Sequence, residues 1–325
     1  MDYDTFIQKL RAYQDSRILL TAIELHLFNA VGAGAPAEEI AERLDTDPRA
    51  TEMLLNALVA VEMLKKRDGL FTNTPLAAQY LTAGSPDNER DAWMHSVNQW
   101  ARWSRLTSCI RTGKAPVLPE IGARGESWIR AFIAAMHRNA AGRAPQLVET
   151  VGASTVARML DIGGGSGAYS IAFALANPNL HAEVFDLPEV LPIAQGHIDA
   201  AGLTGRVVAR AGDLRRDGFG DGYDLILLSA ICHMFGEDGN RDLLRRAYRA
   251  LAPAGRVVIQ DFVLEEDKTT PRMGAIFALN MLVSTHEGNS YSYQEYAGWL
   301  NEAGFQDVSR HWPGEPTGLI VGVRG

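Results

Sequence analysis

The sequence is poor in the residues that several classes of protein require. Its two cysteines, Cys109 and Cys232, lack CxxC spacing, so we expect neither a disulfide framework nor a zinc knuckle. No apolar run has the length of a membrane span, and the N-terminus is acidic rather than a basic leader. These absences predict a protein of a reducing compartment, which we expect in the cytoplasm and without a membrane partner.

Positive charge is also scarce. Lys and Arg number 31 against 39 Asp and Glu, and the net charge of −8 disfavours a sequence-independent grip on nucleic acid. The eight histidines show no paired ligand spacing, so we expect no metal site. The length of 325 residues, with 46% hydrophobic and 22% charged residues, predicts a globular protein of about two domains that handles small molecules.

The N-terminal region has the order of elements of a winged helix. Short helices are expected over 1–82, with one after Pro36 and another after Asp47, followed by a hairpin with Asp68-Gly69 at its tip. Between Pro36 and Gly69 there are eight acidic and five basic residues, which argues against DNA binding. We place this domain at 1–100 and a second domain at 101–325.

The second domain reads as an α/β fold. Residues 88–150 are helical and rich in aromatics, with a Gly- and Pro-rich loop at 113–125. From about residue 155, apolar strands alternate with helical patterns, which predicts a Rossmann-like, mostly parallel sheet. Seven strands are expected, over 157–162, 181–186, 206–211, 223–229, 255–262, 306–311 and 318–323.

The strand 157–162 ends in a glycine-rich turn that opens a helix. Glycines at 163, 165 and 167 permit positive φ and let a ligand approach the main chain closely, as a nucleotide-like cofactor does. The spacing Gly163-x-Gly165-x-x-Ala168 also satisfies the dinucleotide fingerprint. The turn alone leaves NAD and S-adenosylmethionine open.

Three carboxylates bear on the choice of cofactor. Asp186 ends the second strand and suits the ribose hydroxyls of either cofactor. Asp213, with Leu214 for the ring face, suits an adenine amine, and Asp161 suits an α-ammonium but not a pyrophosphate. A proline-glycine turn at 251–255 then leads into the strand 256–262, as in class I methyltransferases. These residues favour S-adenosylmethionine, with an NAD-dependent oxidoreductase as the alternative.

The segment Leu227-Leu-Ser-Ala-Ile-Cys-His-Met-Phe-Gly-Glu-Asp238, with the motifs before it, resembles the plant-type small-molecule O-methyltransferases and their bacterial relatives. This family includes caffeic acid and flavonoid methyltransferases and bacterial enzymes of secondary metabolism. The resemblance implies a class I S-adenosylmethionine-dependent methyltransferase domain and a winged-helix dimerisation domain that forms a homodimer. The implied reaction is methyl transfer to a hydroxyl of an aromatic or polyketide-like molecule, with carbon or nitrogen methylation as alternatives on the same scaffold.

The resemblance also implies a catalytic base. His233 matches the family's histidine, and it follows a strand's carboxyl end, where open α/β sheets bind ligands. An imidazole titrates near neutral pH and can accept a phenolic proton. Asp261 matches the glutamate that orients this histidine, whereas the family's second glutamate falls near Ser290, so we keep Glu287 as a possible substitute.

The remaining site residues are assigned by their places in these motifs. The expected cofactor-binding residues are Asp161, Gly163, Gly165, Gly167, Asp186, Leu187, Gly212, Asp213, Leu214 and Ser229. The expected substrate pocket consists of Trp103, Phe132, Met136, Phe277, Asn280 and Met281, with His286 as a further polar group. We assign His197 to a solvated helix.

Overall fold

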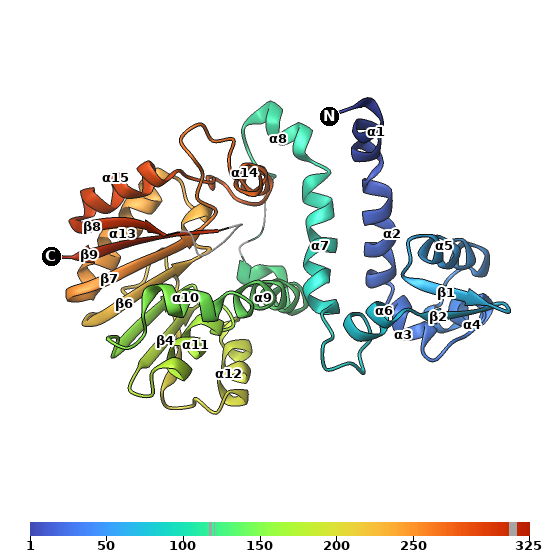
Figure 1. The fold of residues 1–325 in the computed structure, drawn as a ribbon, viewed down its shortest axis with the longest axis horizontal. Coiled ribbons are helices and arrows are strands. Elements are labelled where there is room, and N and C mark those ends of the chain that lie inside the picture. Colours follow the sequence, from blue (N-terminus) through green and yellow to red (C-terminus); the bar gives the residue numbers. More distant parts are fainter. Residues whose placement is uncertain (117–118, 120, 312–316) are drawn as a thin grey trace. The chain divides into compact units, whose positions relative to one another are not determined.

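The computed structural model describes residues 1–116, 119, 121–311 and 317–325. Of the loop expected at 113–125, residues 117, 118 and 120 lie outside this description. The chain forms two compact units, Met1–Trp100 and Ala101–Gly325, and their boundary falls within helix α7. Figure 1 shows the order of the elements along the chain.

The first unit consists of helices and one hairpin. Its helices are α1 (Tyr3–Arg11), α2 (Tyr13–Glu24), α3 (Leu27–Val31), α4 (Ala37–Leu44), α5 (Pro48–Ala60), α6 (Pro75–Tyr80) and most of α7 (Arg90–Trp103). Asp47 begins α5, because its carboxylate accepts a hydrogen bond from Ala50 N at 2.8 Å. Strands β1 (Leu64–Arg67) and β2 (Leu70–Asn73) pair across Asp68 and Gly69, both at positive φ, as a two-residue hairpin turn requires. The expected helix-helix-hairpin order is present.

The second unit is built around one sheet. Its helices are α8 (Leu106–Thr112), η1 (Ile121–Arg124), α9 (Glu126–Ala141), α10 (Ala144–Val151), α11 (Ala168–Ala176), α12 (Leu191–Ala200), η2 (Cys232–Met234), α13 (Glu237–Ala250), α14 (Arg272–Ser284) and α15 (Tyr293–Ala303). Its strands are β3 (Arg158–Ile162), β4 (His181–Asp186), β5 (Val207–Ala211), β6 (Tyr223–Ser229), β7 (Leu251–Asp261), β8 (Phe305–His311) and β9 (Gly318–Arg324). The order is β5-β4-β3-β6-β7-β9-β8, and β9 runs antiparallel to both of its neighbours.

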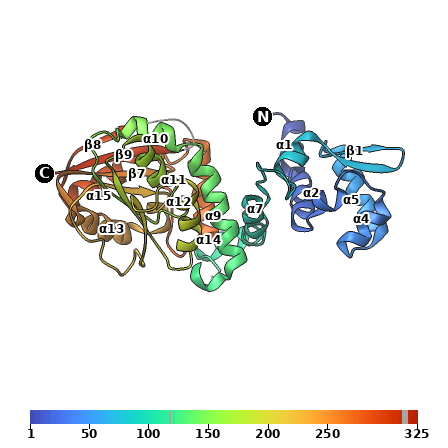
Figure 2. The same ribbon diagram turned by 90° about the horizontal axis from the view of Figure 1, so that it is seen from below.

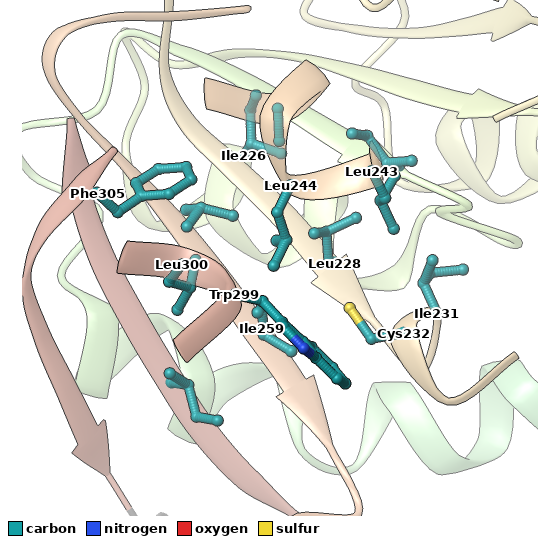
Figure 3. Close-up of a cluster of buried hydrophobic side chains, with 14 of the residues drawn as sticks. Ile226, Leu228, Ile231, Cys232, Leu243, Leu244, Ile259, Trp299, Leu300 and Phe305 are labelled. Carbon is teal, nitrogen blue, oxygen red and sulfur yellow. The ribbon is translucent and has the colours of Figure 1, made fainter. Parts of the chain in front are cut away.

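Both faces of this sheet are covered by helices. Successive residues of a strand point to opposite faces, so the continuous apolar runs of β3 and β6 supply two cores. Side chains of α10, α11 and α12 pack on one face, and those of α13 and α15 pack on the other (Figures 1 and 2). Figure 3 shows the second of these cores, where Leu228 and Ile259 of the sheet meet Leu244 and Trp299 of the helices.

The seven predicted strands are confirmed within one or two residues at most ends, and the α/β class is confirmed with them. The prediction of a turn at 251–255 is wrong, because β7 already begins at Leu251. The strand continues through Pro253 because the pairing of β6 with β7 is irregular between Tyr223 and Leu225, and Ala254 takes a positive φ of 61° there. In the described part of the chain, no helix combines the length and apolar character that crossing a membrane requires.

Candidate functional site

The strand order reverses between β3 and β6. From β3 the chain moves outward to β4 and β5, and it then returns to place β6 on the other side of β3. A crevice at the carboxyl ends of the strands is the ligand site of open α/β sheets with such a reversal. The glycine turn follows β3 and His233 follows β6, so both lie at this point.

The glycine turn needs its glycines for conformation and for space. Gly163, Gly165 and Gly167 have φ values of 68°, 56° and 75°, in the left-handed region that glycine adopts without strain. A Cβ at Gly163 would lie 2.2 Å from Cδ1 of Ile231, so the turn packs directly against the segment after β6. The glycine turn and the segment after β6 are thereby held against each other at the carboxyl edge of the sheet.

Asp161 is the buried charge beneath this turn. Its side chain is 1% exposed, and Oδ2 accepts a hydrogen bond from Ser170 Oγ at 2.9 Å, whereas Oδ1 has no partner among the described residues. Burial, assisted by the nearby Asp186, raises the pKa of Asp161 to about 7, and the Ser170 hydrogen bond opposes this shift. A buried acceptor without a partner is the group that a cationic ligand would satisfy.

Asp186 braces the turn from the end of β4. Its Oδ2 accepts from Gly165 N at 2.8 Å and its Oδ1 from Leu187 N at 2.7 Å, while burial raises its pKa. Each carboxylate oxygen has a second lone pair, so both atoms can still accept a hydrogen bond from a ligand hydroxyl. The structure thus gives Asp186 a role in the turn's conformation that the sequence analysis did not foresee.

The segment after β5 is also close-packed. A Cβ at Gly212 would lie 2.0 Å from the Phe185 ring, so only glycine fits there. Asp213 Oδ1 accepts from Arg215 N at 2.9 Å, and Oδ2 lies 3.5 Å from Arg216 Nε. Leu214 packs beside the core of the sheet. Gly212, Asp213 and Leu214 thus follow β5 at the same edge of the sheet as Asp186, and Gly212 N donates to the carbonyl oxygen of Asp186 at 2.9 Å.

A buried polar network below the site escaped the sequence analysis. Gln260 Oε1 accepts from Ser229 Oγ at 2.5 Å and from Tyr169 Oη at 2.7 Å, and its Nε2 donates to Thr317 Oγ1 at 2.9 Å. This network ties the helix after the glycine turn, α11, to strands β6 and β7 and to Thr317, the residue before β9. A glutamine just before Asp261 in an otherwise apolar strand was the clue in the sequence.

His233 and Asp261 form a buried pair. The side chain of His233 lies in η2 and that of Asp261 at the end of β7, and the Nδ1-to-Oδ1 distance is 2.7 Å. His233 is 6% and Asp261 1% exposed. The aspartate is itself held by the backbone N–H groups of His233 and Phe262, at 3.1 and 2.8 Å, and by Tyr296 Oη at 3.3 Å. Asp261, although one methylene shorter than the glutamate of the family, therefore reaches the His233 imidazole as expected from the sequence.

Aromatic rings surround the histidine on its apolar side. Phe277 of α14 contacts His233 edge-on, with ring centroids 4.8 Å apart, and Phe262 stacks on Phe277 at 3.8 Å. Phe262 was missed, although it directly follows Asp261. On the same helix Asn280 accepts a hydrogen bond from Trp103 Nε1 at 3.0 Å, and Met281 is buried. Figure 1 shows α14 and α9 beside the end of the sheet.

Helix α9 brings the other expected pocket residues to this edge. Phe132 stacks on Trp128 at 5.2 Å, and both, like Leu187, pack against the buried cluster of Ile129, Ile133 and Val190. Met136 is half-buried one turn further on. A Cβ at Gly165 would lie 3.8 Å from Ile133 Cδ1, so α9 also touches the glycine turn.

One sequence-based expectation is wrong, and a second gains no supporting contact among the described residues. His197 is not a solvated residue, because its half-buried ring stacks on His137 with centroids 4.0 Å apart; burial lowers the pKa of both, and His137 Nδ1 lies 2.8 Å from Ser166 Oγ in the glycine turn. Glu287 is exposed, with its carboxylate beside Gly236, and no described contact joins it to the histidine–aspartate pair. Its loop contacts the backbone of His233: Asn289 N donates to the carbonyl oxygen of His233 at 3.0 Å, and a Cβ at Gly288 would lie 2.4 Å from the same oxygen.

The donor set fits a nucleoside cofactor with a cationic tail. Buried Asp161, with its free acceptor atom, lies under a turn with no room for a Cβ at Gly163, and the carboxylate of Asp186 lies at the next strand end. No group of metal-ligating side chains occurs within the described residues. This sheet and site define a class I S-adenosylmethionine-dependent methyltransferase.

Comparison with known proteins identifies the family. The O-methyltransferase domain model matches residues 107–306, and the O-methyltransferase dimerisation domain model matches residues 7–83. The chain is 37% identical over 323 residues to 3-hydroxy-5-methyl-1-naphthoate 3-O-methyltransferase of Streptomyces sahachiroi, with 95% of this chain and 92% of that protein covered. The chain therefore belongs to the O-methyltransferase family, and it is not an NAD-dependent oxidoreductase.

Other relatives agree with this assignment. The chain is 30% identical to the tetracenomycin polyketide synthesis 8-O-methyl transferase TcmO of Streptomyces glaucescens, with 97% of this chain and 95% of that protein covered. Among solved structures, PigF with SAH superposes with a TM-score of 0.91 at 28% identity, covering 99% of this chain and 100% of the other.

Proposed function

We propose that this enzyme transfers the methyl group of S-adenosylmethionine to a hydroxyl of an aromatic or polyketide-like molecule, with His233 as general base and Asp261 as the group that orients it. The observation that carries the proposal is the buried Nδ1-to-Oδ1 contact of 2.7 Å at the carboxyl edge of the sheet. The naphthoate in the name of one relative has a flat aromatic ring system, and the Phe262 and Phe277 rings beside the histidine offer flat faces that such a ring system can pack against.

The pair prepares His233 for proton transfer. Asp261 accepts from Nδ1–H, so the tautomer with a free lone pair on Nε2 is favoured. Nε2 then takes the proton of the acceptor hydroxyl as its oxygen attacks. When bound, the cofactor supplies a methyl group already activated by positive sulfur, so the protein's contribution is alignment and deprotonation.

The same edge offers the groups that would hold the cofactor. Asp161 would bind the α-ammonium, Asp186 the ribose hydroxyls, and Asp213 with Leu214 the adenine. This division rests on the free Oδ1 of Asp161 and on the spare lone pairs of Asp186. The glycines at 163, 165 and 167 would let the cofactor lie against the main chain.

We also propose a homodimer formed through the N-terminal unit. Helix α1 has no buried residue, yet Tyr3, Phe6 and Leu10 recur on one face and are 74%, 42% and 57% exposed, with Tyr13 beyond them at 58%. Such a face on a single chain marks an interaction site. The match to the dimerisation domain of the family supports a second copy as the partner.

The catalytic assignment is tested with H233A and D261N. Loss of a general base should lower kcat by ~10²–10⁴-fold, and D261N should lower it by ~10²-fold or more because the tautomer is no longer set. Binding of S-adenosylhomocysteine, measured by calorimetry, should stay unchanged in both. H181N, at the exposed start of β4, serves as the control. A kcat of H233A within threefold of the parent enzyme would remove His233 from the mechanism.

Product analysis tests the atom that receives the methyl group. Phenolic, quinone and polyketide acceptors are incubated with labelled methyl donor, and the products are analysed by mass spectrometry after acid demethylation. Oxygen transfer predicts a label that acid removes. A label that resists acid would instead establish carbon methylation, and retention on an amine would establish nitrogen methylation.

A further inference from the structure

Two arginines, Arg102 and Arg124, both lie over the ring of Trp128 in the first turn of helix α9. The guanidinium carbon of Arg124 lies 4.5 Å and that of Arg102 5.4 Å from the centroid of Trp128. Both side chains are half-buried. Trp128 in turn stacks on Phe132, with an interplanar angle of 14°. The result is a stack of two rings with two cations on it.

These cations lack a counter-charge within the described residues. Arg124 Nε donates to the carbonyl oxygen of Pro119 at 2.8 Å, which leaves its positive charge uncompensated, and no carboxylate pairs with Arg102. Burial and the charge of Arg102 together lower the pKa of Arg124 to about 10. Two like charges in a half-buried place are unfavourable, and a bound anion would relieve both.

The arginine pair is continuous with the pocket of the proposed reaction. Trp128, Phe132 and Met136 are spaced by four residues on α9 and so lie on one face of that helix. Next to Met136, His137 contacts Ser166 of the glycine turn. The face therefore extends from the cofactor turn to the arginines. Trp103, adjacent to Arg102, donates a hydrogen bond to Asn280 of α14, the helix that also carries Phe277.

We infer that Arg102 and Arg124 form a carboxylate subsite, and that the acceptor is an aromatic hydroxy acid whose carboxylate binds there. The inference rests on the proposed function and deepens it. Guanidinium groups suit this ligand because they bind carboxylates through planar, paired hydrogen bonds while stacking on aromatic faces. Trp128 holds both cations in place without neutralising them. The aromatic body of the acceptor would lie along Phe132 and Met136.

The test compares hydroxynaphthoic acids with their neutral carboxamides as acceptors. For the parent enzyme we expect KM of the best acid to be at least tenfold below that of its amide, as charge-assisted hydrogen bonds imply. R102Q and R124Q should each raise KM for the acid about tenfold or more, with kcat within twofold, and should leave KM for the amide unchanged. R124K should recover only part of the affinity, because lysine lacks the planar fork.

The matched control is R130Q, on the same helix, where an exposed arginine pairs with Glu126 at 2.9 Å. It should leave both acceptors unaffected. Calorimetry of the acid with enzyme preloaded with S-adenosylhomocysteine gives a second readout that needs no turnover. Circular dichroism and melting temperature show whether each variant is folded.

The outcomes separate the inference from the function beneath it. If the parent enzyme methylates acid and amide with equal KM, the carboxylate subsite is overturned and the proposed function stands. If it methylates no hydroxylated aromatic at all, the proposed function fails first. If R124Q weakens self-association and changes KM equally for both acceptors, the arginines serve an interface between copies of the chain, which also overturns the inference.

Discussion

At the scale of single residues, the site depends on carboxylates held in unusual surroundings. Asp161 is almost fully buried with one unpartnered oxygen, and Asp261 accepts hydrogen bonds from two backbone N–H groups as well as from the imidazole. Each carboxylate is thus specialised by its environment. We propose that Asp161 binds a cationic group of the cofactor, whereas Asp261 pairs with the imidazole of His233.

The raised pKa of Asp161 predicts a pH-dependent affinity for the cofactor. With burial raising this pKa to about 7, the carboxyl is mostly protonated at pH 6 and cannot pair with an ammonium. The affinity for S-adenosylhomocysteine should therefore fall about tenfold per pH unit below 7 and level off above it. Binding near pH 6 should release about one proton, which calorimetry in buffers of different ionisation enthalpy measures. D161N should bind weakly with no proton release, and an unchanged release in D161N would assign the proton elsewhere.

At the scale of elements, the glycine turn and the segment after β6 form a single packed unit. Gly163 meets Ile231, Gly165 is held by Asp186, and Ser166 is held by His137 of α9. Three elements distant in the sequence therefore set the conformation of one turn. Ala230, just before Ile231, has a positive φ of 57°, a conformation of alanine that the surrounding packing must enforce.

Substitution of Gly163 tests this packing. G163A should destabilise the protein by about 2–5 kcal/mol, from left-handed strain of about 1–2 and overpacking of about 1–3 kcal/mol. The matched control is G196A in α12, where a Cβ would meet nothing within 4 Å and where alanine favours the helix by about 0.5–1 kcal/mol. Urea unfolding measures both values. Equal stability of the two variants would show that the turn is less tightly packed than described.

At the scale of the whole molecule, the two units have different kinds of surface. The second unit buries both faces of its sheet under helices, whereas helix α1 of the first unit presents apolar side chains to solvent. These side chains would stabilise an assembly in which they were removed from water. The proposed homodimer would bury them.

A double substitution in α1 tests the dimer. F6S with L10S removes two exposed apolar side chains, each worth about 1.5–3 kcal/mol when buried, and should weaken dimerisation ~100-fold or more. Light scattering coupled to size exclusion gives the molar mass as a function of concentration. Q8S on the same helix is the control and should leave the mass unchanged. A double variant that remains dimeric at micromolar concentration would locate the interface elsewhere.

Local patterns were sufficient for most of the fold. Short segments with an apolar centre, rich in Val, Ile and Leu and bounded by turn residues, are typical of buried parallel strands, and β3, β4 and β6 lie where these segments predicted them. The hairpin was also predicted from a local pattern, because Asp68 and Gly69 both tolerate the positive φ that its turn requires. The exception, the start of β7, depended on an irregular pairing with β6 that no single strand encodes.

The chemistry of the site depended on contacts between distant residues. His233 and Asp261 were assigned by motif, but their separation of 2.7 Å follows from the packing of β6 against β7, and no described contact joins Glu287 to the pair. The pairing of Arg102 with Arg124 on Trp128 had no sequence pattern, because it joins residues of α7, η1 and α9. The spacing of apolar residues along one helix or strand is a property of that segment alone, so it can be read from the sequence. The position of one charge relative to another is a property of the packed molecule, so only the tertiary structure placed His233 beside Asp261 and both arginines on Trp128.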